Sequence, residues 1–264
     1  MRRPLGPSNR SFRGSQESLE CYNVIMNEIL LTSDLHGRLD GLDEMLSAVD
    51  IVVIAGDFAD LRGRGKWHIY DQKKWVEKKF IPLLEKHSNV EFIIVPGNHD
   101  FCIDASRCEK IFAGEKDMHI KWPSNAHILL DSGCEVKGLK FYGSPWVPII
   151  SYSWAFEAEN DKLVEKFSKI PEGLDFLVTH TPPAFGHLCD IDKSLQTDSS
   201  HFGSHELAQA IIDKKPKYAI CGHIHTGDHA SYNIEGTIVF NVSRLDERYE
   251  IAFQPLHLSL NQMT

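Results

Sequence analysis

The sequence predicts an α/β domain in which two β-sheets pack face to face with helices on the outside. In the first half, short apolar runs alternate with segments of helical spacing, as in a sheet whose strands are joined by helices. The second half is richer in strand-like runs, which favours a second sheet. With 264 residues, of which 42% are hydrophobic and 25% charged, the chain can bury one large core.

Three strands and two helices are predicted in the first half, in alternating order. The strands are the apolar runs at residues 29–33, 51–55 and 90–95. Between the first two, apolar residues recur at the spacing of an amphipathic helix over residues 39–49. Residues 66–87 form a longer predicted helix, in which Pro82 marks a kink or a break.

The second half predicts strands joined by turns, with two helices among them. The strands are expected at residues 128–130, 139–142, 176–179, 218–221, 230–234 and 237–242. The first two are joined by a predicted turn at residues 131–133, and the last two form a predicted hairpin. Helices are predicted at residues 154–167 and 204–214, the second with Ser204 as its N-cap.

Polar clusters follow five of the predicted strands, each at the point where the strand ends. They are Asp34-Leu35-His36, Gly56-Asp57, Gly97-Asn98-His99-Asp100, His180 and Gly222-His223-Ile224-His225. Because ligands of open α/β sheets bind beyond the carboxyl ends of the strands, these clusters are expected to converge. Carboxylate, amide and imidazole groups together suit two neighbouring Mn, Fe or Zn ions, which can hold a phosphate and activate a water. The sequence therefore predicts a metal-dependent phosphoesterase.

Two details refine this prediction. Asp57 stands alone between the other groups, and a carboxylate has two oxygens, so Asp57 is the natural bridge between two ions. Gly56 and Gly97 fit places where the backbone turns sharply or a ligand approaches closely. Any one of these polar residues alone would indicate a turn or a helix cap, and only the combination indicates metal ligands.

Composition narrows the expected partners and compartment. The net charge of −9 disfavours a nucleic-acid partner, so a small substrate is expected. No apolar run approaches the roughly 20 residues that cross a bilayer, and no membrane partner is expected. The six cysteines form no CxxC pair, which favours a reducing, cytoplasmic location over a disulfide framework. Residues 1–25 predict a flexible tail, with a basic transit or docking segment as the alternative, and the oligomeric state stays open.

Taken in order, the five clusters resemble the calcineurin-like metallophosphoesterase superfamily over about residues 28–243. Three further segments are similar to the MPPED-type metallophosphodiesterase subfamily, namely Gly143-Ser144-Pro145-Trp146, Trp154-Ala155-Phe156 and His180-Thr181-Pro182-Pro183. The resemblance implies a calcineurin-like phosphoesterase fold, a four-layer αββα arrangement of two mixed β-sheets packed as a sandwich and flanked by helices. It also makes residues 26–264 the metallophosphoesterase domain.

The resemblance implies a role for each polar residue of the clusters. Asp34, His36 and His225 would bind one metal, Asn98, His180 and His223 the other, and Asp57 would bridge them. His99 would act on the leaving group, and Asp100 would hold the His99 ring by a hydrogen bond. Two divalent or mixed-valence ions, manganese first and iron or zinc as alternatives, would hold the hydroxide that attacks phosphorus.

The resemblance favours a phosphodiesterase that acts on small molecules such as cyclic nucleotides. A phosphomonoesterase or a nuclease on the same fold is the alternative, although the acidic chain offers no basic groove for nucleic acid. A catalytically weak metal-binding scaffold is a third hypothesis, and the complete ligand set argues against it. His201 and Trp146 are candidate substrate-binding residues, and Trp154 is a further candidate for stacking on a base.

Overall fold

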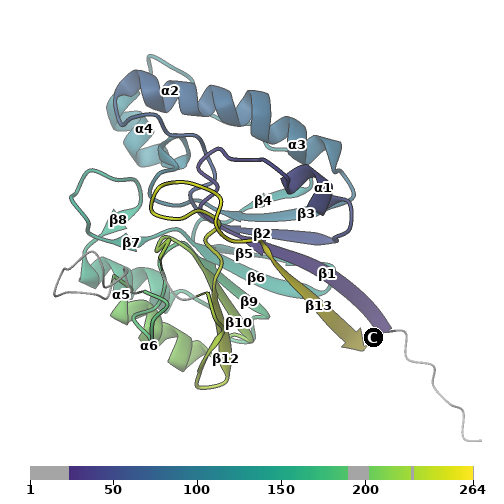
Figure 1. The fold of residues 1–264 in the computed structure, drawn as a ribbon. Coiled ribbons are helices and arrows are strands. Elements are labelled where there is room, and N and C mark those ends of the chain that lie inside the picture. Colours follow the sequence, from purple (N-terminus) through teal and green to yellow (C-terminus); the bar gives the residue numbers. More distant parts are fainter. Residues whose placement is uncertain (1–23, 190–201, 227–228, 264) are drawn as a thin grey trace, which may run out of the picture.

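Two mixed β-sheets with helices on both outer faces make up the computed structural model, which describes residues 24–189, 202–226 and 229–263 (Figure 1). The first sheet has the strand order β13-β1-β2-β3-β4. Its strands are β1 (Val24–Thr32), β2 (Ile51–Ala55), β3 (Glu91–Val95), β4 (Ala126–Ile128) and β13 (Leu256–Met263). All of its pairings are parallel except that of β1 with β13.

The second sheet has the strand order β11-β12-β10-β9-β6-β5. Its strands are β5 (Ser132–Val136), β6 (Leu139–Ser144), β9 (Phe176–Thr179), β10 (Tyr218–Cys221), β11 (Tyr232–Ile234) and β12 (Thr237–Asn241). The central pairings are parallel, and an antiparallel hairpin closes each side. A separate two-stranded sheet joins β7 (Val147–Pro148) to β8 (Glu157–Ala158).

Helices cover the outer face of each sheet. Over the first sheet lie α1 (Leu42–Leu46), α2 (Lys66–Trp75), α3 (Ile81–Lys86) and α4 (Ala105–Phe112), and over the second lie α5 (Asn160–Ser168) and α6 (His205–Lys214). A π-helical turn, Val76–Phe80, links α2 to α3 just before Pro82, so the predicted helix over residues 66–87 is continuous with an altered hydrogen-bond pattern. None of the described helices is long and apolar enough to cross a membrane.

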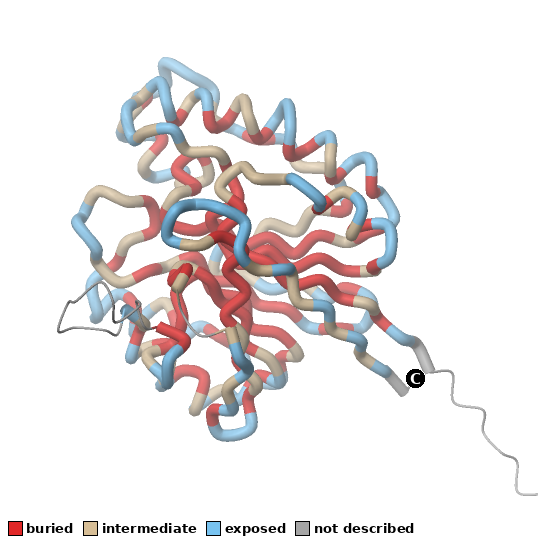
Figure 2. The backbone as a smooth tube through the Cα atoms, in the orientation of Figure 1, coloured by how far each residue is buried: buried red, intermediate tan, exposed pale blue. Residues whose placement is uncertain are grey.

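Strand residues alternate between separate apolar cores, as the two-residue period of a strand requires. In β1, Ile29 and Leu31 face the core between the sheets, where Val178 of β9 also packs. Leu30 points the other way, into the core under the helices of the first sheet, and Leu177 lies in the core under α5 and α6. Figure 2 shows the resulting buried strands between exposed outer layers. The four-layer αββα arrangement is therefore confirmed.

The carboxyl ends of the two sheets meet, which brings distant loops together. Ser33, directly after β1, forms a parallel bridge with Ser243, which lies beyond β12 of the other sheet. The Gly222 N–H after β10 donates to the carbonyl of His180 at 3.0 Å. The ends of β1, β2, β3, β9 and β10 thus carry all five predicted polar clusters.

The helix predicted over residues 154–167 is wrong in its first part. The structure places a loop and the short strand β8 before α5, which begins only at Asn160. The Glu157 carboxylate accepts backbone N–H groups of Ile150, Ser151 and Trp154 at 2.7–2.8 Å. This side chain closes a loop where apolar spacing alone indicated a helix.

The turn predicted to join strands at residues 128–130 and 139–142 is also wrong. β4 belongs to the first sheet, and β6 pairs instead with β5, across a two-residue turn in which Lys137 and Gly138 both have positive φ. The helix predicted over residues 39–49 is shorter, because Gly41 before α1 has a left-handed backbone. Helix α4 and strand β13 were not predicted, and the predicted tail lies outside the described residues except for its last two, which begin β1.

Candidate metal centre

Potential metal-ligand atoms gather where the strand ends of both sheets meet. The Asp34 group consists of Asp34, His36 and His225, and the Asp57 group consists of Asp57, His180 and His223. In each group the ligand atoms lie within 4.8 Å of one another. A third combination of His36, Asp57 and His99 overlaps both groups, so the two form one continuous cluster.

Asp57 lies between the two groups. Its Oδ2 is 3.2 Å from Nε2 of His180 and 3.8 Å from Nε2 of His36. Asn98 joins the Asp57 group, since its Oδ1 lies 3.0 Å from the same His180 nitrogen. In the Asp34 group, Nε2 of His225 is 3.3 Å from the Asp34 carboxylate. Every residue predicted as a metal ligand is therefore in this cluster, with Asp57 between its two groups.

The loops that carry these side chains have unusual backbone conformations. Four of the predicted ligand residues have left-handed backbone without being glycine: Asp34 (φ 54°), His36 (φ 42°), Asp57 (φ 52°) and His223 (φ 71°). Such a conformation costs about 1–3 kcal/mol per residue and persists only where the surroundings impose it. Here the N–H groups of Asp34 and His36 donate to the carbonyls of Gly56 and Asp57 at 2.9 and 2.8 Å. The two strand-end loops thus hold each other in place.

Two glycines allow the cluster to pack this closely. A Cβ on Gly97 would lie 2.2 Å from Oδ1 of Asp57, and a Cβ on Gly56 would lie 2.1 Å from Nδ1 of His180. No side chain fits at either position, and Gly56 also has a φ of +99°. The sharp turn predicted is confirmed at Gly56, and at both glycines the group that approaches the backbone closely is a side chain of the cluster.

Hydrogen bonds orient the histidines so that one ring nitrogen faces the cluster. Nδ1 of His180 donates to the carbonyl of Ala55 at 2.9 Å, and Nδ1 of His225 donates to the carbonyl of Asp246 at 3.0 Å. This is the arrangement by which proteins fix a metal-binding imidazole. Nε2 of His36 is buried and has no hydrogen-bond partner. A buried nitrogen without a partner is unfavourable, and coordination to a metal ion would satisfy it. The donor set and this orphaned nitrogen fit a metal centre.

The electrostatics of the cluster favour positive charge. Burial acts against a charged imidazole, yet Asp57 raises the pKa of His180 to about 9 and Asp34 raises that of His225 to about 9. Burial prevails at the other two, lowering the pKa of His36 to about 4 and that of His223 to about 3. The two buried carboxylates therefore attract cations, and metal ions would displace the protons that His180 and His225 otherwise keep.

Comparison with known proteins agrees with this geometry. The sequence profile of calcineurin-like phosphoesterases matches residues 28–227. The chain belongs to the calcineurin-like phosphoesterase family. It is 29% identical over 250 residues to metallophosphoesterase domain-containing protein 1 of Homo sapiens, an alignment that covers 86% of this chain and 69% of that protein.

A UPF0046 protein of Caenorhabditis elegans is 29% identical over 231 residues, covering 85% of this chain and 77% of that protein. One solved structure superposes with a TM-score of 0.60 at 18% identity, over 90% of this chain and 99% of that chain, which shows the shared fold. The phosphoesterase family uses a two-metal centre, and the Asp34 and Asp57 groups are candidate ligand clusters for one here.

Asp100 has a different environment from the predicted one. Its buried carboxylate accepts the backbone N–H groups of Gly97 at 2.7 Å, Ala59 at 2.9 Å and Phe58 at 3.4 Å. In the part of the chain that the structure describes, no hydrogen bond joins it to the His99 ring. Burial, with the charge of Asp57, raises the pKa of Asp100 to about 8. The predicted role is corrected accordingly, because the residue ties two strand-end loops of the phosphoesterase centre together.

Aromatic contacts, rather than Asp100, fix the His99 ring. The ring stacks on Trp154 with centroids 4.4 Å apart and an interplanar angle of 26°, and its edge meets His36 at 4.7 Å. The backbone is held as well, since the His99 N–H donates to Asp57 Oδ1 at 2.8 Å. Gln72 of α2 donates to the His99 carbonyl at 2.8 Å. Trp154, named in the sequence as a base-stacking candidate, is thus a partner of His99.

Of the two predicted substrate-binding residues, Trp146 lies within the described part of the chain. His201 lies outside the described residues. Trp146 donates its indole N–H to Asp131 at 2.8 Å, and the Lys166 ammonium lies 4.1 Å from its ring centroid, so its contacts are with the fold around α5.

Two residues near the metal centre were missed. Ser243 donates to Oδ2 of Asp34 at 2.7 Å, and Tyr249 lies against the rings of His36 and His225. Ser243 follows the predicted strand over residues 237–242, so the rule that found the other clusters could have found it. Tyr249 has no comparable signal.

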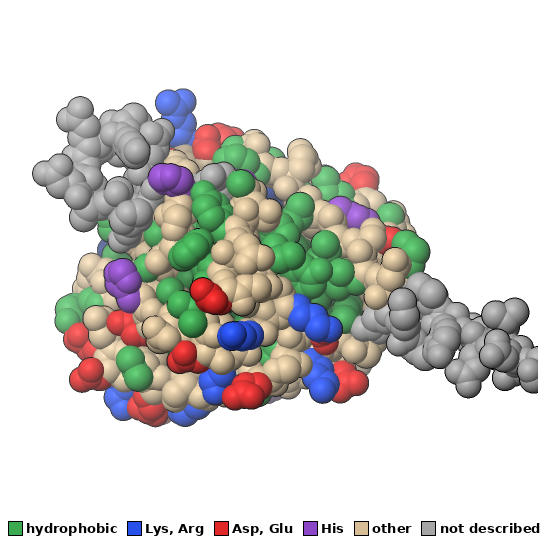
Figure 3. All heavy atoms as spheres, turned by 90° about the horizontal axis from the view of Figure 1, so that it is seen from below, with side chains coloured by type: hydrophobic (Ala, Val, Ile, Leu, Met, Phe, Trp, Pro, Cys, Tyr) green, Lys and Arg blue, Asp and Glu red, His purple; other side chains and the backbone are tan. Residues whose placement is uncertain are grey.

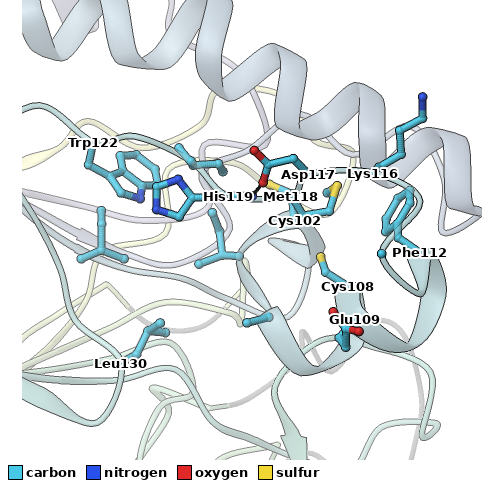
Figure 4. Close-up of a pocket in the computed structure, with 15 residues that line it drawn as sticks. Cys102, Cys108, Glu109, Phe112, Lys116, Asp117, Met118, His119, Trp122 and Leu130 are labelled. Carbon is cyan, nitrogen blue, oxygen red and sulfur yellow. Dashed lines mark hydrogen bonds between the residues drawn. The ribbon is translucent and has the colours of Figure 1, made fainter.

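A separate cavity of about 550 Å³ lies beside Cys102, Ile103 and helix α4 (Figure 4). Its lining includes Phe112, Trp122 and Leu130 together with the thiols of Cys102 and Cys108. None of the predicted metal ligands lines it. This cavity is therefore distinct from the phosphoesterase centre.

Proposed function

We propose that this protein is a metal-dependent phosphodiesterase of small molecules, with cyclic nucleotides as the first substrate class to test. The single observation that carries the proposal is the joining of the two ligand groups at Asp57. Seven side chains from the loops of two sheets meet there, and one of them, His36, has a buried ring nitrogen without a hydrogen-bond partner. A cluster that only stabilised the fold would not need such an unsatisfied nitrogen.

The Asp34 group would hold one metal ion, and the Asp57 group with Asn98 would hold the second. Two such ions supply the charge that polarises a phosphoryl oxygen and lowers the pKa of a bound water. Manganese, iron and zinc all suit carboxylate, amide and imidazole ligands, and manganese is the ion proposed here.

The chain's own groups have distinct tasks around these ions. Asp57 accepts the backbone N–H of His99 through Oδ1 and faces the ligand histidines through Oδ2, so one carboxylate aligns His99 with both ligand groups. Stacking on Trp154 restricts the plane of the His99 ring, from which it would donate a proton or a hydrogen bond to the leaving oxygen. Orienting this ring in advance reduces the entropy lost on reaching the transition state.

Charge argues for a small substrate over nucleic acid. On the face seen in Figure 3, Lys and Arg side chains are interspersed with Asp and Glu, unlike the basic surface that nucleic acid selects.

The proposal is tested by comparing bis(p-nitrophenyl) phosphate with p-nitrophenyl phosphate, using protein loaded with Mn²⁺. We expect the diester to have the higher kcat/KM, and Asp57→Asn to lose metal and turnover together. Asp161→Asn, which alters an exposed carboxylate of α5, is the matched control and should keep both.

The outcomes separate the alternatives. Preference for the monoester would replace the proposal with a small-molecule phosphatase, and bound metal without any turnover would replace it with a metal-binding scaffold. If the diester is preferred, 3′,5′-cyclic and 2′,3′-cyclic nucleotides are the next substrates. Failure of both would remove the cyclic-nucleotide part of the proposal.

A further inference from the structure

A tight hairpin at residues 245–251, between β12 and β13, lies beside the Asp34 group (the yellow loop in Figure 1). Its ends are bridged, and the Asp246 N–H donates to the Glu250 carbonyl at 2.9 Å. The Asp246 carboxylate accepts the N–H groups of Arg248 and Glu250 at 2.9 and 3.0 Å. The Asp246 carbonyl accepts from His225 Nδ1 at 3.0 Å. The hairpin is thus ordered by its own bonds and fixed to a ligand histidine.

Tyr249 is the residue that this hairpin presents to the site. Its ring centroid lies 4.8 Å from that of His36 and 5.4 Å from that of His225, at interplanar angles of 80° and 74°. The backbone φ of Tyr249 is 61°, a conformation that non-glycine residues avoid unless something requires it. The side chain nevertheless stays 45% exposed. One part of the ring touches two candidate ligands, and the rest is open to an incoming molecule.

The other aromatic residue near the centre has less surface to offer. Trp154 stacks on His99, and the guanidinium of Arg64 lies 4.4 Å from its ring centroid. Ring contacts run from Tyr249 through His36 and His99 to Trp154, whose ring also meets that of Phe101 with centroids 6.1 Å apart. Of Tyr249 and Trp154, Tyr249 therefore has the more open ring.

We propose that Tyr249 binds the organic group of the substrate and thereby selects phosphoesters in which this group is planar, such as an aryl ring or a nucleobase. This rests on the proposed function, since it takes the phosphate to lie between the two ligand groups. Because the Tyr249 ring adjoins His36 and His225, it would be within reach of the organic substituent of a phosphate held there. An exposed aromatic face gains most from stacking on another flat group and gains little from a methyl group.

The test compares phenylphosphonate with methylphosphonate, which share the anionic head and differ in the planar group. Binding of each to Mn²⁺-loaded protein is measured by titration calorimetry, so no turnover is needed. Wild type should bind phenylphosphonate more tightly, and Tyr249→Ala should reduce that preference about 10-fold. Tyr249→Phe keeps the ring and should keep the preference. Ile251→Ala removes another partly exposed side chain of the same hairpin and should behave as wild type.

Each failure has its own signature. If neither phosphonate binds metal-loaded wild type, the proposed function fails. If both bind and Tyr249→Ala leaves their ratio unchanged, only the assignment of Tyr249 fails. If Tyr249→Ala weakens Mn²⁺ binding and both phosphonates equally, the ring only supports His36 and His225, and the substrate role is refuted.

Discussion

Adding one methyl group at Gly97 tests the close packing of the metal centre. The new Cβ of Gly97→Ala would lie 2.2 Å from Oδ1 of Asp57 and 2.7 Å from Nε2 of His180, whereas ordinary contacts begin at 3.4 Å. The carboxylate or its loop therefore has to move by about 1.2 Å, the difference between 3.4 and 2.2 Å. A displacement of about 1 Å at catalytic groups can lower the rate about 100-fold, and overpacking typically costs about 1–3 kcal/mol of stability.

The assay for Gly97→Ala is Mn²⁺ titration of the metal-free protein, followed by hydrolysis of bis(p-nitrophenyl) phosphate. We expect Mn²⁺ affinity to fall at least 10-fold and kcat/KM about 100-fold. Gly114→Ala is the matched control, because its Cβ meets nothing within 4 Å while its φ of +79° makes alanine unfavourable by about 1–2 kcal/mol. A folded Gly97→Ala protein with the metal affinity and turnover of wild type would refute the placement of Asp57 and His180 in the centre.

Three further predictions follow from the contacts of the centre. Ser243→Ala removes the hydroxyl that donates to Asp34 at 2.7 Å, so Mn²⁺ affinity measured by titration should fall about 10- to 100-fold. Trp154→Leu removes the ring stacked on His99 and should lower kcat roughly 10-fold with two metals still bound, less than the 10²–10⁴ expected for losing an acid–base residue. In metal-free protein the pKa of His180 is raised from 6.5 to about 9, so the stability it contributes is present below pH 6.5 and is lost as pH rises through about 9. Melting temperatures in EDTA should fall over that range, while Mn²⁺ affinity rises because fewer protons compete; a flat profile of both would contradict this pKa.

The members of the candidate metal cluster could be predicted because local sequence decides where they lie. Asp34, Asp57 and Asn98 each follow a buried parallel strand, and strands of one sheet end at a common edge. The partners that refine the site depend on tertiary packing. The carboxylate of Asp100 accepts an N–H from residue 59 of another loop, and His99 finds Trp154 55 positions later. Neither contact leaves a pattern in the sequence.

The strands and helices also divide into those that local sequence decides, which were predicted, and those that tertiary packing decides, which were missed. β2 was predicted with its correct bounds, since a run of five buried apolar residues has few alternatives. β5 was missed because it is an edge strand whose sequence alternates only weakly between polar and apolar residues. The neighbouring apolar run around Leu129 was the stronger indication of a strand. Leu129 lies just beyond β4 and is buried in the core between the sheets. Its apolar character therefore reflects burial in this core and does not indicate a strand that pairs with β6. Side-chain capping by Glu157 likewise overrides the helical spacing before α5.

The most direct test of the two-metal centre is the metal content of the purified protein. Wild-type protein incubated with excess Mn²⁺ and passed through a desalting column would be measured by inductively coupled plasma mass spectrometry, beside Asp57→Asn and Asp161→Asn. Two manganese ions per chain in wild type and Asp161→Asn, and a loss of at least one in Asp57→Asn, is the predicted result. No bound manganese, iron or zinc in wild type, or an undiminished content in Asp57→Asn, would contradict a centre bridged by Asp57.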